Sequence, residues 1–252
     1  MKHKIYSSIL LMFFVLLESG LVFAKNNFNY SYTPGYRYDA SQENYNEAKE
    51  KILFIIDFSN SMNEQLTMNK TKLDIALDTM YSILPRISPN TWVGLRVYGH
   101  SGGFTPFTSC KSSQLISPIS KNNASNIASQ LSRVRAVGMT PITYSLKQAI
   151  NSDFAGFNGM KHIILLSDGG ENCDESPCQY IVDLMKFRDD VKIDVIAFAI
   201  SDEDANNQLK CVSLVTTGKF YTANTAADLV DSIENSLHME KNVSGQVIIN
   251  NK

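Results

Sequence analysis

The sequence predicts an α/β protein with a doubly wound, mostly parallel six-stranded sheet and helices on both faces. Short apolar runs alternate with segments whose apolar residues recur every three or four positions, which indicates alternating strands and helices. The runs are apolar throughout, as is typical of parallel strands buried on both faces. The chain has 252 residues, of which 44% are hydrophobic and 19% charged, enough for one domain with a substantial core.

Six segments are predicted to be strands. Ile52–Asp57 is a continuous apolar run that ends in an acid, and Ile163–Ser167 is a second such run, followed by Asp168. Gln114–Ile119 contains Pro118, which favours a position at the edge of the sheet. In chain order the predicted strands cover residues 52–57, 92–98, 114–119, 163–167, 193–200 and 220–221.

The predicted helices are marked by apolar spacing and by the residues at their ends. Apolar residues from Leu73 to Leu84 recur at three- and four-residue intervals, and Pro85 ends this helix. Thr140-Pro141 is a good helix start because proline is favoured in the first turn. The predicted helices cover residues 73–84, 127–131, 142–150, 177–188, 208–215 and 226–237.

The N-terminus resembles a secretory signal. Lys2–Lys4 is a positively charged start, Ile9–Leu17 is an apolar run, and Val22 and Ala24 are small residues before a predicted cut at Lys25. A membrane anchor is the alternative, but the run is shorter than the roughly 20 residues that span a bilayer. We therefore expect a periplasmic or secreted product without a transmembrane segment. The expected parts are a signal at 1–24, an irregular leader at 25–48, a domain at 49–240 and a tail at 241–252.

Three separate segments are expected to meet where the strands end, since ligands of open α/β sheets bind outside the carboxyl ends of the strands. These segments are Asp57-Phe58-Ser59-Asn60-Ser61, Gly138-Met139-Thr140-Pro141 and Ser167-Asp168-Gly169-Gly170. Together they offer two carboxylates and three hydroxyls, those of Asp57, Asp168, Ser59, Ser61 and Thr140. Oxygen donors of this kind suit Mg²⁺, Mn²⁺ or Ca²⁺. The sequence therefore predicts a divalent-cation site at this edge.

In this order and on this alternation, the three motifs resemble the metal-ion-dependent adhesion site (MIDAS) of von Willebrand factor A (VWA) domains. The resemblance covers residues 50–237 and is closest to exported bacterial members, which share the segments Val97–His100, Cys173–Cys178 and Thr217–Tyr221. It implies the Rossmann-like VWA fold.

The resemblance also implies a role for each site residue. Ser59, Ser61 and Thr140 would ligate the ion directly, whereas Asp57 and Asp168 would act largely through bound water. The implied cofactor is Mg²⁺, or else Mn²⁺ or Ca²⁺, and the implied partner is a protein that presents Asp or Glu at the sixth position. The chain departs from the family at Gly169-Gly170-Glu171, where relatives place the acid after one glycine, so no role passes to Glu171.

The cysteines of an exported chain point to disulfides. Their even number, four, favours two disulfides in an oxidising compartment. Zinc is the alternative, but no Cys-x-x-Cys pair is present. Cys173 and Cys178 flank a short acidic loop directly after Asp168, which predicts that they pair with each other and leave Cys110 with Cys211. Four cysteines allow three pairings, so the other two remain open here.

The expected function is that of a binding module and not of an enzyme. A net charge of −2 gives no basic footprint for nucleic acid. A metal-dependent hydrolase is one alternative; it needs a general base and an oxyanion stabiliser beside the ion, for which Glu171 and His100 are the candidates. A structural subunit of an envelope complex, with a metal that only stabilises the fold, is the other alternative.

Overall fold

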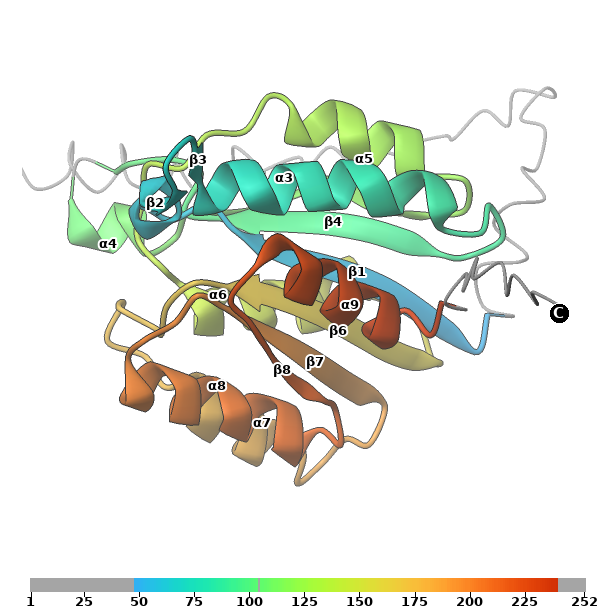
Figure 1. Ribbon diagram of the computed structural model, residues 1–252. Coiled ribbons are helices and arrows are strands. Elements are labelled where there is room, and N and C mark those ends of the chain that lie inside the picture. The colour runs from blue at the N-terminus through green and yellow to red at the C-terminus, as the bar shows by residue number, and fades with distance from the viewer. Residues whose placement is uncertain (1–47, 104, 240–252) are drawn as a thin grey trace, which may run out of the picture. The chain divides into compact units, whose positions relative to one another are not determined.

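A six-stranded sheet forms the centre of the protein (Figure 1). The computed structural model describes residues 48–103 and 105–239, so the predicted signal, the predicted tail and nearly all of the predicted leader lie outside the described residues. In spatial order the strands are β5 (Ser113–Ser120), β4 (Val93–Tyr98), β1 (Glu50–Asp57), β6 (Met160–Ser167), β7 (Val191–Phe198) and β8 (Phe220–Ala223). Strand β5 pairs antiparallel with β4, and the other pairs are parallel.

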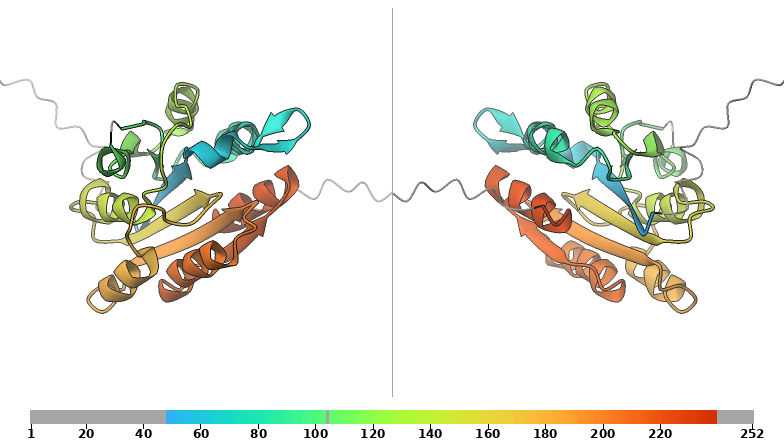
Figure 2. Two further views of the ribbon diagram at one scale, coloured as in Figure 1. Left: turned by 90° about the vertical axis from the view of Figure 1, so that its left-hand side faces the viewer. Right: turned by 90° about the vertical axis from the view of Figure 1, so that its right-hand side faces the viewer.

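Helices cover both faces of this sheet (Figure 2). Helices α3 (Lys72–Ile83), α5 (Ala124–Leu131) and α9 (Ala226–Ser236) pack on one face, and α6 (Ile142–Gln148), α7 (Pro177–Leu184) and α8 (Glu203–Val215) pack on the other. Strand β1 sends Phe54 into the first core and Leu53 and Ile55 into the second, because successive side chains of a strand point to opposite faces. The predicted fold class is confirmed.

The ends of two helices illustrate how caps set helix bounds. Thr71 and Asp74 form a capping box at the start of α3, and a 3-10 turn, η2 (Leu84–Arg86), follows this helix at Pro85. Helix α8 begins at Glu203 and not at the predicted residue 208, because the carboxylate of Asp202 accepts the backbone N–H of Ala205 at 2.8 Å. The apolar spacing inside α8 starts only later, which is why the spacing alone placed its start too far along the chain.

Besides η2, five short elements of the described residues were not predicted as separate elements, because they are polar or too short to show a period. They are η1 (Asn60–Asn63), the hairpin of β2 (Gln65–Thr67) and β3 (Lys70–Thr71), α4 (Pro106–Ser109) and η3 (Ala149–Asp153), a π-helical turn that continues α6. The hairpin and α4 lie at the carboxyl end of the sheet (Figure 1). They therefore belong to the surroundings of the predicted site.

The chain order creates a switch point at this end of the sheet. Strands β4, β1 and β6 are neighbours, so Tyr98, Asp57 and Ser167 end side by side. The helix that follows β1 packs on one face and the helix that follows β6 packs on the other. Such a divergence leaves a crevice outside the strand ends, where α/β proteins bind their ligands.

Candidate metal centre

Asp57 ends β1 and is fully buried. Its Oδ1 accepts the backbone N–H of Ser59 at 2.6 Å, a bond that turns the chain sharply after the strand. Its Oδ2 accepts hydrogen bonds from the Tyr98 hydroxyl at 2.9 Å and the Ser167 hydroxyl at 2.8 Å. Burial, with the nearby charge of Asp168, raises the pKa of Asp57 to about 6. A positive charge at this place would therefore favour the ionised carboxylate.

The turn after Asp57 brings two hydroxyls to the second carboxylate. Ser59 Oγ lies 3.0 Å from Ser61 Oγ, and Ser61 Oγ donates to Asp168 Oδ1 at 2.7 Å. Ser59 is buried, and so is the carboxylate of Asp168. Four of the five predicted site residues are thus joined by hydrogen bonds, with the backbone N–H of Ser59 as the link to Asp57.

The Thr140 loop is docked against the same turn. The backbone N–H of Asn60 donates to the carbonyl of Gly138 at 2.9 Å, and Ser59 forms an isolated parallel bridge with Gly138. Gly99, at φ +69°, permits this approach, since a Cβ there would lie 2.6 Å from the Ser59 nitrogen and 2.7 Å from the Met139 carbonyl oxygen. Thr140 is 4% exposed. The structure therefore places the loop that carries the fifth predicted residue against the turn that carries Ser59.

A lysine that the sequence analysis missed also contacts this site. Lys72 is the first residue of α3, and its ammonium group lies 3.0 Å from Asp168 Oδ2 and 2.8 Å from Glu64 Oε2. Burial lowers the pKa of Lys72, but the bonds to Glu64 and Asp168 raise it by more, so the pKa of Lys72 is raised overall. A lysine in a first helical turn is electrostatically unfavourable, and this signal was available in the sequence.

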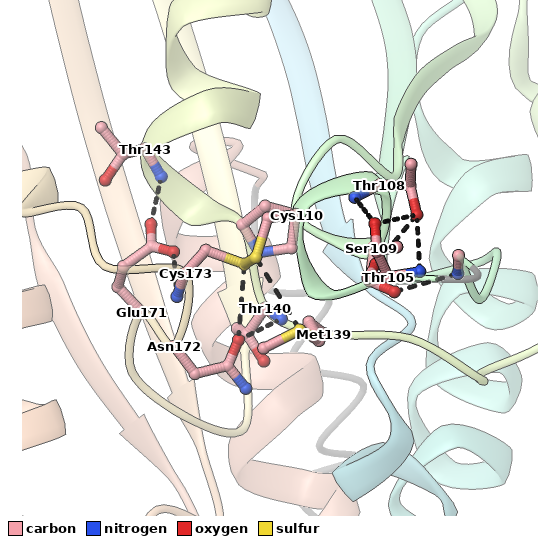
Figure 3. Close-up of a disulfide and its surroundings, with 12 residues drawn as sticks. Thr105, Thr108, Ser109, Cys110, Met139, Thr140, Thr143, Glu171, Asn172 and Cys173 are labelled. Carbon is pink, nitrogen blue, oxygen red and sulfur yellow. Dashed lines mark hydrogen bonds between the residues drawn. A yellow bond between two sulfur atoms is a disulfide. The ribbon is translucent and has the colours of Figure 1, made fainter.

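Glu171 and Asn172 hold the start of α6 (Figure 3). The carboxylate of Glu171 accepts the backbone N–H of Thr143 at 2.7 Å and that of Cys173 at 3.0 Å. The side-chain oxygen of Asn172 accepts the backbone N–H of Thr140 at 2.7 Å. Burial raises the pKa of Glu171. These contacts give Glu171 a positioning role, and no local pattern marked Asn172 because its partner is distant in sequence.

The predicted disulfide pairing is wrong. The structure pairs Cys110 with Cys173 and Cys178 with Cys211, each with a Cα–Cα distance of 5.5 Å. Cys178 lies in the first turn of α7, which packs on α8, where Cys211 lies. Cys173 belongs instead to the loop after Asp168, where it meets Cys110 at the end of α4 (Figure 3). The short separation of Cys173 and Cys178 in the sequence therefore did not predict their pairing. Helix α7 begins between them, so Cys178 faces α8 while Cys173 stays in the loop near α4.

The first disulfide ties together the loops around the site. It joins the connection between β4 and β5 to the loop that carries Asn172, which in turn holds Thr140. The sulfur of Cys110 also lies 3.8 Å from the sulfur of Met139, the residue before Thr140. The Cys110–Cys173 disulfide therefore fixes the position of the Thr140 loop relative to the loop that follows Asp168.

The donor set fits a hard divalent cation. It consists of three hydroxyls and two buried carboxylates, and oxygen ligands of these kinds suit Mg²⁺, Mn²⁺ or Ca²⁺. Within residues 48–103 and 105–239 no group of three or more His, Cys, Asp or Glu side chains is arranged to hold a metal. The described residues therefore do not offer the nitrogen- and sulfur-rich cluster of a structural zinc site.

Two proteins of Bacillus subtilis (strain 168) are similar to this chain in sequence. The uncharacterized protein YwmD is 27% identical over 193 residues, which cover 75% of this chain and 85% of YwmD. The uncharacterized protein YwmC is 26% identical over 196 residues, with 75% and 85% covered.

Solved structures share the fold at lower identity. The von Willebrand factor type A protein from Catenulispora acidiphila has a TM-score of 0.59 and 17% identity, over 75% of this chain and 42% of that one. Proximal thread matrix protein 1 from the mussel byssus, with a zinc-occupied MIDAS motif, has a TM-score of 0.56 and 19% identity, over 75% and 45%. This chain thus matches less than half the length of either protein.

A third structure, the domain of the type V pili tip protein Mfa5 from Porphyromonas gingivalis, has a TM-score of 0.54 and 16% identity, over 75% of this chain and 94% of that one. The sequence model of the von Willebrand factor type A domain matches residues 51–235, a span that contains all five residues of the candidate site and nearly the whole described sheet and its helices. The chain therefore belongs to the von Willebrand factor type A domain family.

Proposed function

We propose that this protein is an exported binding module that holds a divalent cation and captures an Asp or Glu carboxylate of a partner protein through it. One observation carries the proposal, namely that hydrogen bonds join Asp57, Ser59, Ser61 and Asp168, through the backbone N–H of Ser59 and then through the two serine hydroxyls. The mussel protein with a zinc-occupied MIDAS motif supports a cation in this fold, and the tip protein of type V pili supports an exported role.

The chain's own residues orient the donors for such an ion. Ser61 directs its hydroxyl hydrogen at Asp168 and accepts from the Ser59 hydroxyl, which leaves one lone pair of Ser61 free for a cation. Asp57 holds the backbone of Ser59 in place, and Asn172 holds that of Thr140. Ser59, Ser61 and Thr140 would be direct ligands, with Asp57 and Asp168 behind them. The bound ion, Mg²⁺ or else Mn²⁺ or Ca²⁺, would supply a positive centre with a position free for a carboxylate.

Several contacts favour binding over catalysis. Both carboxylate oxygens of Glu171 are engaged by backbone N–H groups, so Glu171 is not placed as a general base. Nδ1 of His100 is buried and has no hydrogen-bond partner among the described residues, so this nitrogen is not hydrogen-bonded to any predicted site residue. Gly99–Gly103 matches the Gly-x-Ser-x-Gly pattern of serine hydrolases, but Ser101 Oγ pairs with Ser112 Oγ at 2.9 Å, whereas such a nucleophile needs a base.

Export is supported by the cysteines. All four are paired in disulfides, and disulfides persist in oxidising compartments. None of the described helices combines the length and apolar character needed to cross a bilayer. With the signal-like N-terminus, this supports a periplasmic or secreted site of action.

The proposal predicts that a carboxylate displaces water from a cation on the protein. We expect Mn²⁺ bound to the purified chain to enhance water-proton relaxation, and glutarate to lower this enhancement by about one third, since one of three water-filled positions of a six-coordinate ion is taken. Glutaramide, which has the same shape but no charge, should leave the enhancement unchanged. The measurement is a glutarate titration followed by proton relaxation.

Two variants show whether Mn²⁺ binds at the candidate site or elsewhere on the surface. Asp57→Ala should abolish the enhancement at Mn²⁺ concentrations that saturate the wild type. The matched change Asp183→Ala, at an exposed residue of α7, should leave it intact. If Mn²⁺ binds but glutarate does not change the enhancement of water-proton relaxation, the result would favour the alternative of a structural subunit, in which the metal only stabilises the fold.

A further inference from the structure

Lys72 is a buried cation in contact with the candidate metal centre. The residue is 8% exposed, and its ammonium bonds to a carboxylate that is fully buried, that of Asp168. The backbone N–H of Lys72 also donates to the carbonyl of Glu64 at 2.9 Å. Backbone and side chain thus hold this positive charge beside the site.

The location of this lysine is electrostatically unfavourable for the helix alone. Lys72 occupies the first position of α3, whose amino end carries the positive pole of the helix dipole. The helix cap does not need it, because Thr71 and Asp74 supply the capping box. The benefit of a cation here therefore lies in its contacts with Asp168 and Glu64.

The two oxygens of Asp168 have different partners. Oδ1 accepts the hydroxyl of Ser61, on the side of the ligand hydroxyls, and Oδ2 accepts Lys72. A cation held by the hydroxyls would approach the Oδ1 side, so the bond to Lys72 can persist when the site is loaded. Lys72 then acts on the loaded site as well as on the empty one.

The charges around the site suggest what the lysine does. Asp57 and Asp168 bring two negative charges, which a divalent cation alone would neutralise completely. The Glu64 side chain is 64% exposed, so water screens its charge. Counting the buried groups alone, without Glu64, the loaded site keeps one unit of positive charge with Lys72 in place.

We infer that Lys72 sets the ligand preference of the metal centre: it weakens the hold on the cation and strengthens the attraction of the loaded site for an anionic ligand. The inference rests on the proposed function, because it concerns the same cation and the same carboxylate. A charge acting over several ångströms changes binding by an amount that depends on the local dielectric, and about ten-fold is the expected order here. Removing the charge should therefore change the two affinities in opposite directions.

The test compares three substitutions in the full chain. Lys72→Met removes the charge and keeps much of the side-chain length, Lys72→Gln removes it and keeps a hydrogen-bond donor, and Lys72→Arg keeps it. Lys70→Met is the matched control, since Lys70 is exposed two residues away and pairs with Asp78 outside the site. Calorimetry with Mn²⁺ gives the cation Kd, and water-proton relaxation with glutarate gives the carboxylate Kd.

We expect Lys72→Met and Lys72→Gln to bind Mn²⁺ about ten-fold more tightly and glutarate about ten-fold more weakly. Lys72→Arg and Lys70→Met should resemble the wild type in both. Folded neutral variants that lose affinity for Mn²⁺, or keep it unchanged, would overturn the inference and leave Lys72 as a tether for Asp168. If Lys72→Met does not fold, the Gln variant decides. A wild type that binds no Mn²⁺ would instead refute the proposed function, and the inference with it.

Discussion

Replacing both Cys110 and Cys173 by serine should lower the free energy of unfolding by about 4 kcal/mol and weaken the metal centre as well. The disulfide closes a loop of 63 residues, and loop-closure entropy gives an effect of this size. For a domain of this length, the loss corresponds to a fall in Tm of about 8–16 °C. The effect on the centre follows because Cys173 adjoins Asn172, which holds the backbone of Thr140.

The second disulfide provides the matched control. Cys178 and Cys211 close a loop of 33 residues between α7 and α8, so their replacement should also cost about 4 kcal/mol. Among the described residues, neither cysteine adjoins a residue that hydrogen-bonds to one of the five site residues, whereas Cys173 adjoins Asn172, and the Kd for Mn²⁺ should stay that of the wild type. Thermal unfolding and calorimetry on both double variants give the two quantities. Equal cation affinity in the two variants would contradict the positioning role of the first disulfide.

Asp57→Asn should stabilise the metal-free protein at pH 7.5 by about 3 kcal/mol. The folded-state pKa of Asp57 is about 6, above the ordinary value of about 3.9, so the folded state binds this proton more tightly than the unfolded state. Stability is therefore highest below pH 4 for this group and falls as the pH rises through 6. An amide fits the site, because Ser167 can direct its hydroxyl to the Gly169 carbonyl, 2.8 Å away, and accept from the new donor.

The same variant should lose most of its response to Mg²⁺. At a hundred times its Kd, Mg²⁺ should add about 2.7 kcal/mol to the wild type, and we expect less than about 1 kcal/mol for Asp57→Asn at that concentration. Chemical unfolding of both proteins from pH 4 to 8 gives a difference curve from which the other titrating groups cancel. A flat difference curve would contradict the raised pKa of Asp57, and equal gains from Mg²⁺ would contradict its role in binding the cation. Asp183→Asn, on the exposed face of α7, should match the wild type throughout.

Apolar patterning was sufficient to predict the sheet and its helices. The buried strands β1, β6 and β7 are apolar on both faces, so their runs were visible without any tertiary information. The start of α8 was misplaced because it depends on the side chain of Asp202 and not on apolar spacing. The hairpin of β2 and β3 and the short α4 carry few apolar residues, and no periodic signal marked them.

The sequence motifs at the ends of the strands predicted which residues come together at the candidate site. Asp57, Ser59, Ser61 and Asp168 are joined by direct contacts, and their role as cation ligands stays a prediction. Asn172 was missed because its contact links segments far apart in sequence. The disulfides were mispaired for a similar reason, since the packing of α7 on α8 decides which sulfur atoms meet.

A divalent cation at this edge of the sheet can be located in crystals of the protein grown with Mn²⁺ and measured at the manganese absorption edge. We expect an anomalous peak roughly 2.1 Å from the hydroxyl oxygens of Ser59, Ser61 and Thr140, and its loss in Asp57→Asn crystals grown in the same way. Manganese peaks only elsewhere, with these three hydroxyls free of any ion at saturating Mn²⁺, would contradict a cation site at this edge.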